Sequence, residues 1–268
     1  MGQLQDVVAS LTAEGEELDQ LLAGLDDAQW ALPTPSPGWT ITHQVAHLAA
    51  TFRLAGAAAA DPAVFGQIAS RLGPDFDENV RVAMAPYLQL PPAALRSAVH
   101  RDLTDATRAL AVVPADQVVP WLVNPLPPAV LGCAGLMELF GHGQDIRDAL
   151  VVTRELTDRI GHLVGFAVRT KDFGYLARGL TPPVEEFRFE LTSPSGLLWT
   201  FGPQDAGQRV TGDAGDFCLL VTRRRHPADL AVSATGAVAR HWLNIAQAYR
   251  GPAGNGRTPG QFHLPQAA

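Results

Sequence analysis

The stretch that most constrains the fold of this chain is residues 132–150, GCAGLMELFGHGQDIRDAL. On a helix, Glu138 and His142 are four residues apart and therefore lie on one face. A carboxylate and an imidazole on one helix face can bind the same metal ion, as related Glu/His spacings do in helical bundles. Because a single pair of this kind often arises by chance, the prediction depends on a second helix that faces this one.

A second helical stretch of this kind is residues 39–51, WTITHQVAHLAAT, which carries His43 and His47 four residues apart. Two facing helices would then bring together a histidine from one helix and Glu138 with His142 from the other. Three protein ligands leave one coordination position open, which is typical of a catalytic metal. The alternative, from spacing alone, is two core histidines and a glutamate on a helix surface.

The remaining pattern divides the chain into a helical part and a mixed part. Helical periodicity predicts helices over 7–25, 40–60, 76–84, 91–110, 132–150 and 156–176. After Thr181-Pro182-Pro183 the pattern changes to strands at 186–191, 197–201 and 208–212, helices at 213–221 and 237–248, and a strand or helix edge at 229–235. We therefore expect an α+β protein with a helical domain over 1–180, an α+β domain over 181–260 and a flexible tail over 261–268.

Charge and composition exclude several classes of partner. The net charge of −7 disfavours sequence-independent binding to nucleic acid, which needs a basic face on the protein. No run of 18 apolar residues is present, and the first residues lack the pattern of a secretory signal. The two cysteines, Cys133 and Cys218, are too few for a disulfide framework. We expect a cytoplasmic protein that binds a small molecule and neither a membrane nor nucleic acid, with a homodimer as one expectation for its assembly.

Several motifs together resemble a known family. They are LTAEGEELDQLLAGLDDAQWALPTPSPGWT, VAHLA, LMELFGHGQDIRDAL, KDFGYLARGLTPP, FRFELTSPSGLLWTFGP, DFCLLVTRRRHPADL and LNIAQAYRGP, spread over residues 4–260. These motifs resemble the mycothiol-dependent maleylpyruvate isomerase-like proteins of actinobacteria, within the wider DinB-like metal-binding bundles. The resemblance implies an N-terminal DinB-like four-helix bundle followed by a small, sterol-carrier-like α+β domain.

The resemblance also implies a metal site and a thiol cofactor. The metal triad of the family falls on His47, Glu138 and His142, a ligand set that suits Zn²⁺ and similar divalent ions. The implied cofactor is mycothiol. Gly141 and Gly143 flank His142 and would let a backbone or a substrate approach closely.

Two residues near the triad have open interpretations. Asp145, three residues after His142, could accept a hydrogen bond from a ligand imidazole and fix its tautomer, or it could be an exposed helix-surface acid. His43 departs from the family pattern and could be a fourth ligand, a general base beside the metal, or an ordinary polar residue at a helix start.

Other candidate site residues come from the rest of the chain. The resemblance implies that arginines near Arg223, Arg224 and Arg225 bind substrate carboxylates, and the alternative is a solvated basic turn. The Pro-rich connection 114–130, with Trp121, could cover the site or be a simple crossover between helices. Trp39 is a further candidate for the substrate pocket.

One local difference from the family suggests a larger substrate. Close relatives resemble this chain but carry Trp-Ala where Phe140 and Gly141 stand. The smaller pair predicts more space beside the metal and a bulkier substrate.

Three functions fit these observations. The first is a metal-dependent enzyme that activates a thiol, or polarises a carbonyl, for isomerisation or thiol transfer on a small electrophile. The second is a thiol-independent tailoring enzyme, a cyclase, lyase or hydrolase of natural-product biosynthesis. The third is a non-catalytic carrier of an apolar ligand.

Overall fold

The computed structural model describes residues 3–262, which form two compact units that divide between Arg154 and Glu155. The division lies earlier than the boundary near residue 180 expected from the Pro-rich break. The reason is that helix α8 (Gly161–Arg169) packs on α10 (Ala214–Val221) and so belongs to the second unit. Of the tail expected over 261–268, residues 263–268 lie outside the described part of the chain. Across residues 3–262, every helix falls short of the length or apolar character that crossing a membrane requires.

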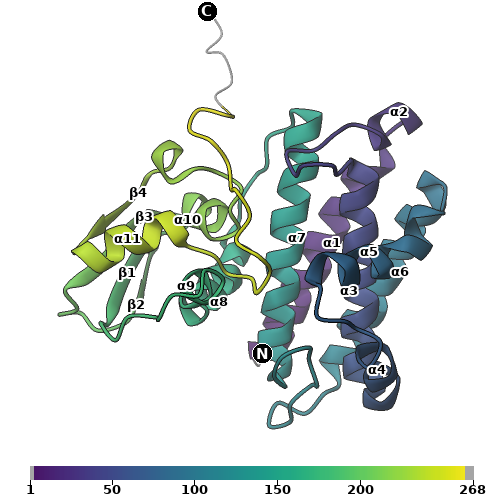
Figure 1. Ribbon diagram of the computed structural model, residues 1–268, viewed down its shortest axis with the longest axis horizontal. Helices are drawn as coiled ribbons and strands as arrows, with labels where there is room; N and C mark the ends of the chain where they lie inside the picture. Colours follow the sequence, from purple (N-terminus) through teal and green to yellow (C-terminus); the bar gives the residue numbers. More distant parts are fainter. Residues whose placement is uncertain (1–2, 263–268) are drawn as a thin grey trace, which may run out of the picture. The chain divides into compact units, whose positions relative to one another are not determined.

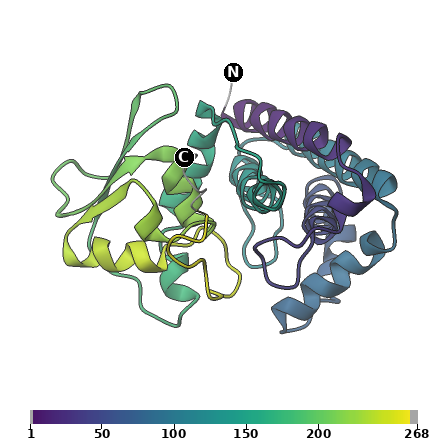
Figure 2. The ribbon, with the colours of Figure 1, turned by 90° about the horizontal axis from the view of Figure 1, so that it is seen from above.

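Four long helices dominate the first unit: α1 (Gln3–Ala23), α3 (Ile41–Ala60), α6 (Pro92–Ala111) and α7 (Pro128–Leu150). They pack against one another, and Figure 2 looks nearly along the axes of α3 and α7 (Figures 1 and 2). The shorter helices α2 (Asp27–Trp30), α4 (Pro62–Ala69) and α5 (Phe76–Leu88) lie in the connections between them. Apolar residues at helical spacing form the shared core, among them Leu11, Leu18, Val45, Phe52, Leu95, Leu139 and Ile146.

Local sequence fixes where α3 and α7 lie. Thr40 is the N-cap of α3, as its position before the apolar run predicts. On α7, a Cβ atom at Gly132 would lie 2.6 Å from Cγ1 of Val7, so glycine allows α1 to approach α7 closely at this point. These contacts hold α7 against α1 while another face of α7 packs on α3.

The second unit is built on a four-stranded sheet with the order β2-β1-β3-β4. Its strands are β1 (Phe187–Thr192), β2 (Leu198–Phe201), β3 (Gln208–Asp213) and β4 (Val232–Thr235). β1 and β3 are parallel, and the other neighbouring pairs are antiparallel. The β1–β2 hairpin turns at Gly196, whose φ of 85° suits glycine. The alternating pattern thus predicts the first three strands correctly.

Buried aromatic side chains join the sheet of the second unit to its helices. Phe189 of β1, Phe217 of α10 and Trp242 of α11 (Ala237–Ile245) lie within 6.1 Å of one another, ring centroid to ring centroid. Their burial supplies much of the apolar core of this small unit.

The helix expected over 156–176 is broken into three pieces. A 3₁₀ turn η1 (Asp158–Ile160) precedes α8, and a separate α9 (Phe173–Leu176) follows it. The carbonyl oxygen of Lys171 accepts a hydrogen bond of 2.8 Å from the indole of Trp242. That carbonyl would bond to the backbone four residues later in a continuous helix, so tertiary packing interrupts the helix here.

Candidate metal centre

Three side chains from α3 and α7 converge on one point in the first unit. Oε2 of Glu138 lies 3.4 Å from Nε2 of His47 and 3.2 Å from Nε2 of His142. The two imidazole rings are 4.4 Å apart between centroids. The three ligand atoms lie within 4.8 Å of one another, and the side chains are 14–22% exposed. The structure therefore brings together the three residues that the family resemblance assigns to a metal, within reach of solvent.

The electrostatics of this group favour a negative charge on Glu138. Burial by itself would raise the pKa of this carboxyl. The hydrogen bonds and positive charge that His142 and His47 offer outweigh the burial and hold the pKa of Glu138 well below its ordinary value. The site therefore offers an ionised oxygen ligand between two imidazole nitrogens, a donor set that suits a borderline divalent ion.

Gln44 controls the other nitrogen of His142. Oε1 of Gln44 lies 2.5 Å from Nδ1 of His142, and this contact is a hydrogen bond when Nδ1 carries the hydrogen and donates it. Nε2, on the opposite side of the ring, then faces the carboxylate of Glu138. Two acceptor atoms at this distance repel each other unless a cation, either a proton or a metal ion, lies between them. The residues present thus fit a bound divalent metal.

Trp39 lies against all three histidines of the region. Its ring centroid is 5.9 Å from that of His142, with the rings nearly parallel, and 5.5 Å from that of His47. The distance to His43 is 6.4 Å. Trp39 belongs to the turn-rich connection before α3, which is closed by the backbone bridge between Pro33 and Thr40. This position of Trp39 is consistent with the expectation that it adjoins the site.

The structure gives His43 a local role at the start of α3. Its Nδ1 accepts a hydrogen bond from the backbone N–H of Thr40 at 3.3 Å and lies 2.8 Å from the Thr40 hydroxyl oxygen. Within the described residues, the group that could hold a metal consists of the triad without His43. This position supports the interpretation of His43 as a polar residue at a helix start, and a role as general base stays a prediction.

Asp145 is fully buried, so it is not the exposed helix-surface acid that was one of its two interpretations. Its Oδ2 accepts from Oγ of Ser36 at 2.8 Å and from Nε2 of Gln44 at 3.4 Å. Sequence reasoning missed Gln44, although its place three residues before His47 puts both on one helix face.

Phe140 is not placed as the sequence suggested. It is two residues from both Glu138 and His142, which on a helix turns it to nearly the opposite face of α7. Its buried ring lies 4.4 Å from the guanidinium carbon of Arg154, which also pairs with Glu14. The hypothesis that a phenyl ring here opens space beside the metal is therefore not supported. The neighbouring Gly141 is buried within α7.

Trp121 also lies away from the triad. It stacks on Phe65 of α4, with 6.1 Å between ring centroids, and it packs with a cluster that includes Ala58 and Leu131. Ala58 is 11 residues after His47, about 16 Å along the axis of α3. These contacts place the Pro-rich connection towards the opposite end of α3 and favour the interpretation of it as a crossover between helices, while a role in covering the site stays a prediction.

Arg223, Arg224 and Arg225 lie in the second unit, directly after α10. Arg223 has a φ of 59°, in the left-handed region, and its guanidinium is 3.5 Å from the carbonyl oxygen of Gly254. The guanidinium of Arg225 lies 3.9 Å from the ring of Phe262. The assignment of these arginines to substrate carboxylates stays a prediction.

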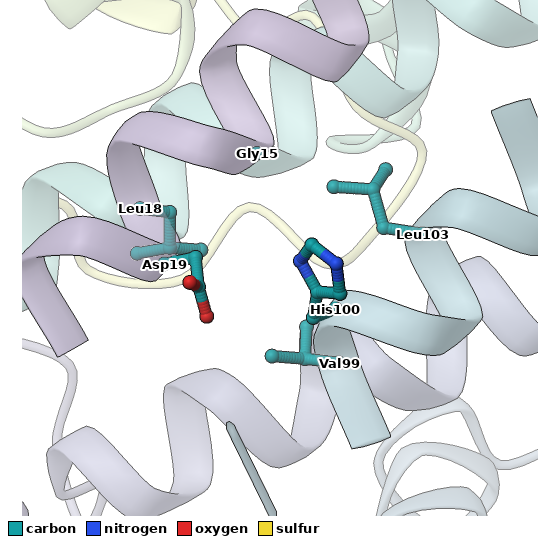
Figure 3. Close-up of a pocket in the computed structure, with 6 residues that line it drawn as sticks. All are labelled: Gly15, Leu18, Asp19, Val99, His100 and Leu103. Atoms are coloured by element: carbon teal, nitrogen blue, oxygen red, sulfur yellow. The ribbon is translucent and has the colours of Figure 1, made fainter. Parts of the chain in front are cut away.

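A small hollow lies between α1 and α6, away from the triad (Figure 3). It is lined by Gly15, Leu18, Asp19, Val99, His100 and Leu103. Its volume of about 10 Å³ is enough for about one water molecule and too small for a substrate. The hollow shares no residue with the triad.

Comparison with known proteins identifies the family of this chain. The family model of the mycothiol maleylpyruvate isomerase N-terminal domain matches residues 11–147, and a model for wyosine base formation matches residues 183–235. Two uncharacterized proteins of Mycobacterium tuberculosis, from strains CDC 1551 and H37Rv, are each 42% identical over 250 residues, which is 93% of this chain and 97% of theirs.

Solved structures show the same fold. The crystal structure of the mycothiol-dependent maleylpyruvate isomerase is similar with a TM-score of 0.57 and 15% identity, over 86% of this chain and 92% of that one. A histidine-to-alanine mutant of that enzyme matches with a TM-score of 0.56 and 16% identity over the same shares. The first family model covers all three residues of the triad and about half of the sequence. The chain therefore belongs to the mycothiol maleylpyruvate isomerase N-terminal domain family.

Proposed function

We propose that this chain is a metal-dependent isomerase or thiol transferase that acts on a small electrophile with mycothiol as its thiol. The metal, which we propose to be zinc, would be held by His47, Glu138 and His142. The observation that carries this proposal is that one carboxylate oxygen faces two imidazole nitrogens at 3.2–3.4 Å. Family membership supports the same assignment.

With these three protein ligands, a metal held there would keep one coordination position open for a further group. A divalent metal held there would lower the pKa of a thiol and keep it as a thiolate at neutral pH. The Glu138 carboxylate balances part of the positive charge, and the ring of Trp39 borders the space beside the two histidines.

The proposed reaction begins when a thiolate sulfur adds to one carbon of an activated double bond, so that a C–S bond forms and the π electrons move towards the conjugated carbonyl. Rotation about the resulting single bond, followed by expulsion of the same thiolate, restores the double bond with the opposite geometry. Protonation of the adduct instead gives a thioether, which is thiol transfer. Arg223, Arg224 or Arg225 would bind a substrate carboxylate through a planar guanidinium.

The finer structural expectations are also proposals. The packing of α1, α3, α6 and α7 supports a DinB-like four-helix bundle. A sterol-carrier-like identity for the second unit, a homodimer and a cytoplasmic location stay predictions.

The experiment that tests the function is a titration of the Co²⁺-substituted protein with mycothiol. The proposal predicts new sulfur-to-cobalt charge-transfer absorption bands when mycothiol is added. It also predicts mycothiol-dependent isomerisation of maleylpyruvate or a related cis-enone acid. Glu138→Gln should lose both signals. A protein that binds Co²⁺ with a spectrum insensitive to thiol, and that lacks thiol-dependent turnover, would contradict the thiol mechanism and favour the thiol-independent alternative.

A further inference from the structure

The strongest feature beyond the triad is a chain of buried hydrogen bonds behind His142. It runs from Asp145 on α7, through Gln44 on α3, to Nδ1 of His142. Ser36 and Thr34, from the connection before α3, bond to Asp145 and Gln44 respectively. Gln44 and Asp145 are both fully buried, so water does not compete for these hydrogen bonds and their partners are the protein groups named above.

Two oxygen atoms determine which way the Gln44 amide points. Thr34 gives its own hydroxyl hydrogen to the carbonyl oxygen of Trp39 at 2.9 Å, so its Oγ1 accepts from Nε2 of Gln44, which is 2.8 Å away. An ionised Asp145 has only acceptors, and its Oδ2 lies 3.4 Å from the same Nε2. Rotating the amide by half a turn would place Oε1 of Gln44 against both oxygens. The amide nitrogen must therefore face Thr34 and Asp145.

This orientation decides the tautomer of His142. With the amide nitrogen turned away, Gln44 presents its Oε1 to Nδ1 of His142, and only an N–H can satisfy that acceptor. A ligand imidazole commonly has its second nitrogen held by such a partner, which fixes both the tautomer and the ring orientation. Here the partner is an amide, whose orientation is set in turn by a carboxylate.

We propose that Asp145 and Gln44 are positioning residues that hold His142 in the tautomer with its proton on Nδ1, so that the lone pair of Nε2 points at the metal position beside Glu138. This inference rests on the proposed metal centre. It also links α7 to the connection that carries Trp39, because Ser36 and Thr34 belong to the same hydrogen-bond network.

The test compares Asp145→Asn with Asp148→Asn, the same change one turn further along α7, where the carboxylate bonds to Gln144. An asparagine at 145 can donate as well as accept, so only Thr34 still requires the amide nitrogen of Gln44. The amide can then turn over in part of the molecules, and the preference for a proton on Nδ1 is weakened. Long-range ¹H–¹⁵N spectra of metal-free, ¹⁵N-histidine-labelled protein report the tautomer. His142 should carry its proton on Nδ1 in wild type and in Asp148→Asn, and should become a mixture in Asp145→Asn.

Zinc affinity, measured by competition with a chelator, provides the second readout. We expect Asp145→Asn and Gln44→Met each to weaken zinc binding by about 10- to 100-fold. If Asp145 acts through Gln44, the double variant is no weaker than Gln44→Met alone. Gln44→Met carries both readouts if Asp145→Asn does not fold.

An Asp145→Asn protein with an unchanged His142 tautomer and zinc affinity within about twofold of wild type would overturn the inference. A folded wild type that binds no zinc but loses the Nδ1 preference on Asp145→Asn would support it, while the proposed function would fail. The two failures are therefore distinguishable.

Discussion

Oε2 of Glu138 lies 3.2 Å from Nε2 of His142, one helical turn further along α7. Both atoms are acceptors when His142 is neutral and protonated on Nδ1, so the arrangement needs a cation between them. This relationship underlies the proposed metal centre, and it follows from an i, i+4 pair that the sequence alone displays.

Trp39 should report metal binding through its fluorescence, because its indole lies 5.5–5.9 Å from the rings of two proposed ligands. Addition of Co²⁺ should quench part of the emission of the wild type. Trp39→Phe should lose this response, although the chain contains four other tryptophans. An equal response in Trp39→Phe would show that Trp39 does not adjoin the metal.

Phe140→Trp should leave metal content unchanged and lower stability. The ring is buried beneath Arg154 on the face of α7 away from the triad, so a larger ring overpacks that face at a cost of about 1–3 kcal/mol. Denaturant unfolding measures the stability, and elemental analysis measures the metal. A loss of metal at unchanged stability would restore the idea that position 140 borders the site.

Glycine-to-alanine substitutions should have opposite effects at Gly132 and Gly66. At Gly132 the new Cβ would meet the stiff Val7 side chain at 2.6 Å, so we expect destabilisation by about 1 kcal/mol or more, despite the better helix propensity of alanine. At Gly66 in α4 the space is open, so alanine should stabilise by about 0.5–1 kcal/mol. Denaturant unfolding of both variants measures the signs, and equal signs would contradict the close α1–α7 packing.

Asp19→Asn should weaken the protein at neutral pH and have little effect in acid. Arg96 donates two hydrogen bonds to Asp19, at 2.6 and 2.7 Å, and lowers the pKa of this carboxyl below its ordinary 3.8. A depressed folded-state pKa contributes stability above pH 3.8 that is lost as the pH falls through the folded value. The pair is partly exposed and screened by solvent, so we expect about 0.5–1 kcal/mol at pH 7.

The control for Asp19 is the exposed Asp105, which should tolerate asparagine with little change at either pH. Thermal unfolding as a function of pH gives the comparison. A difference between wild type and Asp19→Asn that persisted or grew at low pH would contradict this assignment.

Much of the fold could be predicted because periodicity and caps are local. The Thr40 cap, the ends of α6, the C-terminal end of α7 and the first three strands follow from spacing, proline positions and alternation, whereas α7 begins at Pro128, four residues before the expected start. The break near Lys171 could not be predicted, since it depends on a bond from Trp242, about 70 residues later. The division between the compact units differs from the expected domain boundary for a related reason, because the unit to which a helix near a proline break packs is a tertiary property.

The pairing of Glu138 with His142 could be predicted from its i, i+4 spacing, and the choice of His47 over His43 came from the family resemblance. The surroundings of these residues could not be predicted. Gln44 has no distinctive sequence signal, and its role arises only when α3 and α7 place it between Asp145 and His142. Phe140 shows the converse, because it is adjacent to the site in sequence but turned away from it by the helix.

The central claim is most directly tested by measuring zinc content after equilibrium dialysis of wild type and His47→Ala, with His100→Ala on α6 as the matched histidine control. The account predicts one equivalent of zinc in the wild type and in His100→Ala, and a small fraction of an equivalent in His47→Ala. A wild type that binds no zinc, or a His47→Ala protein that binds as much as the wild type, would contradict the metal centre.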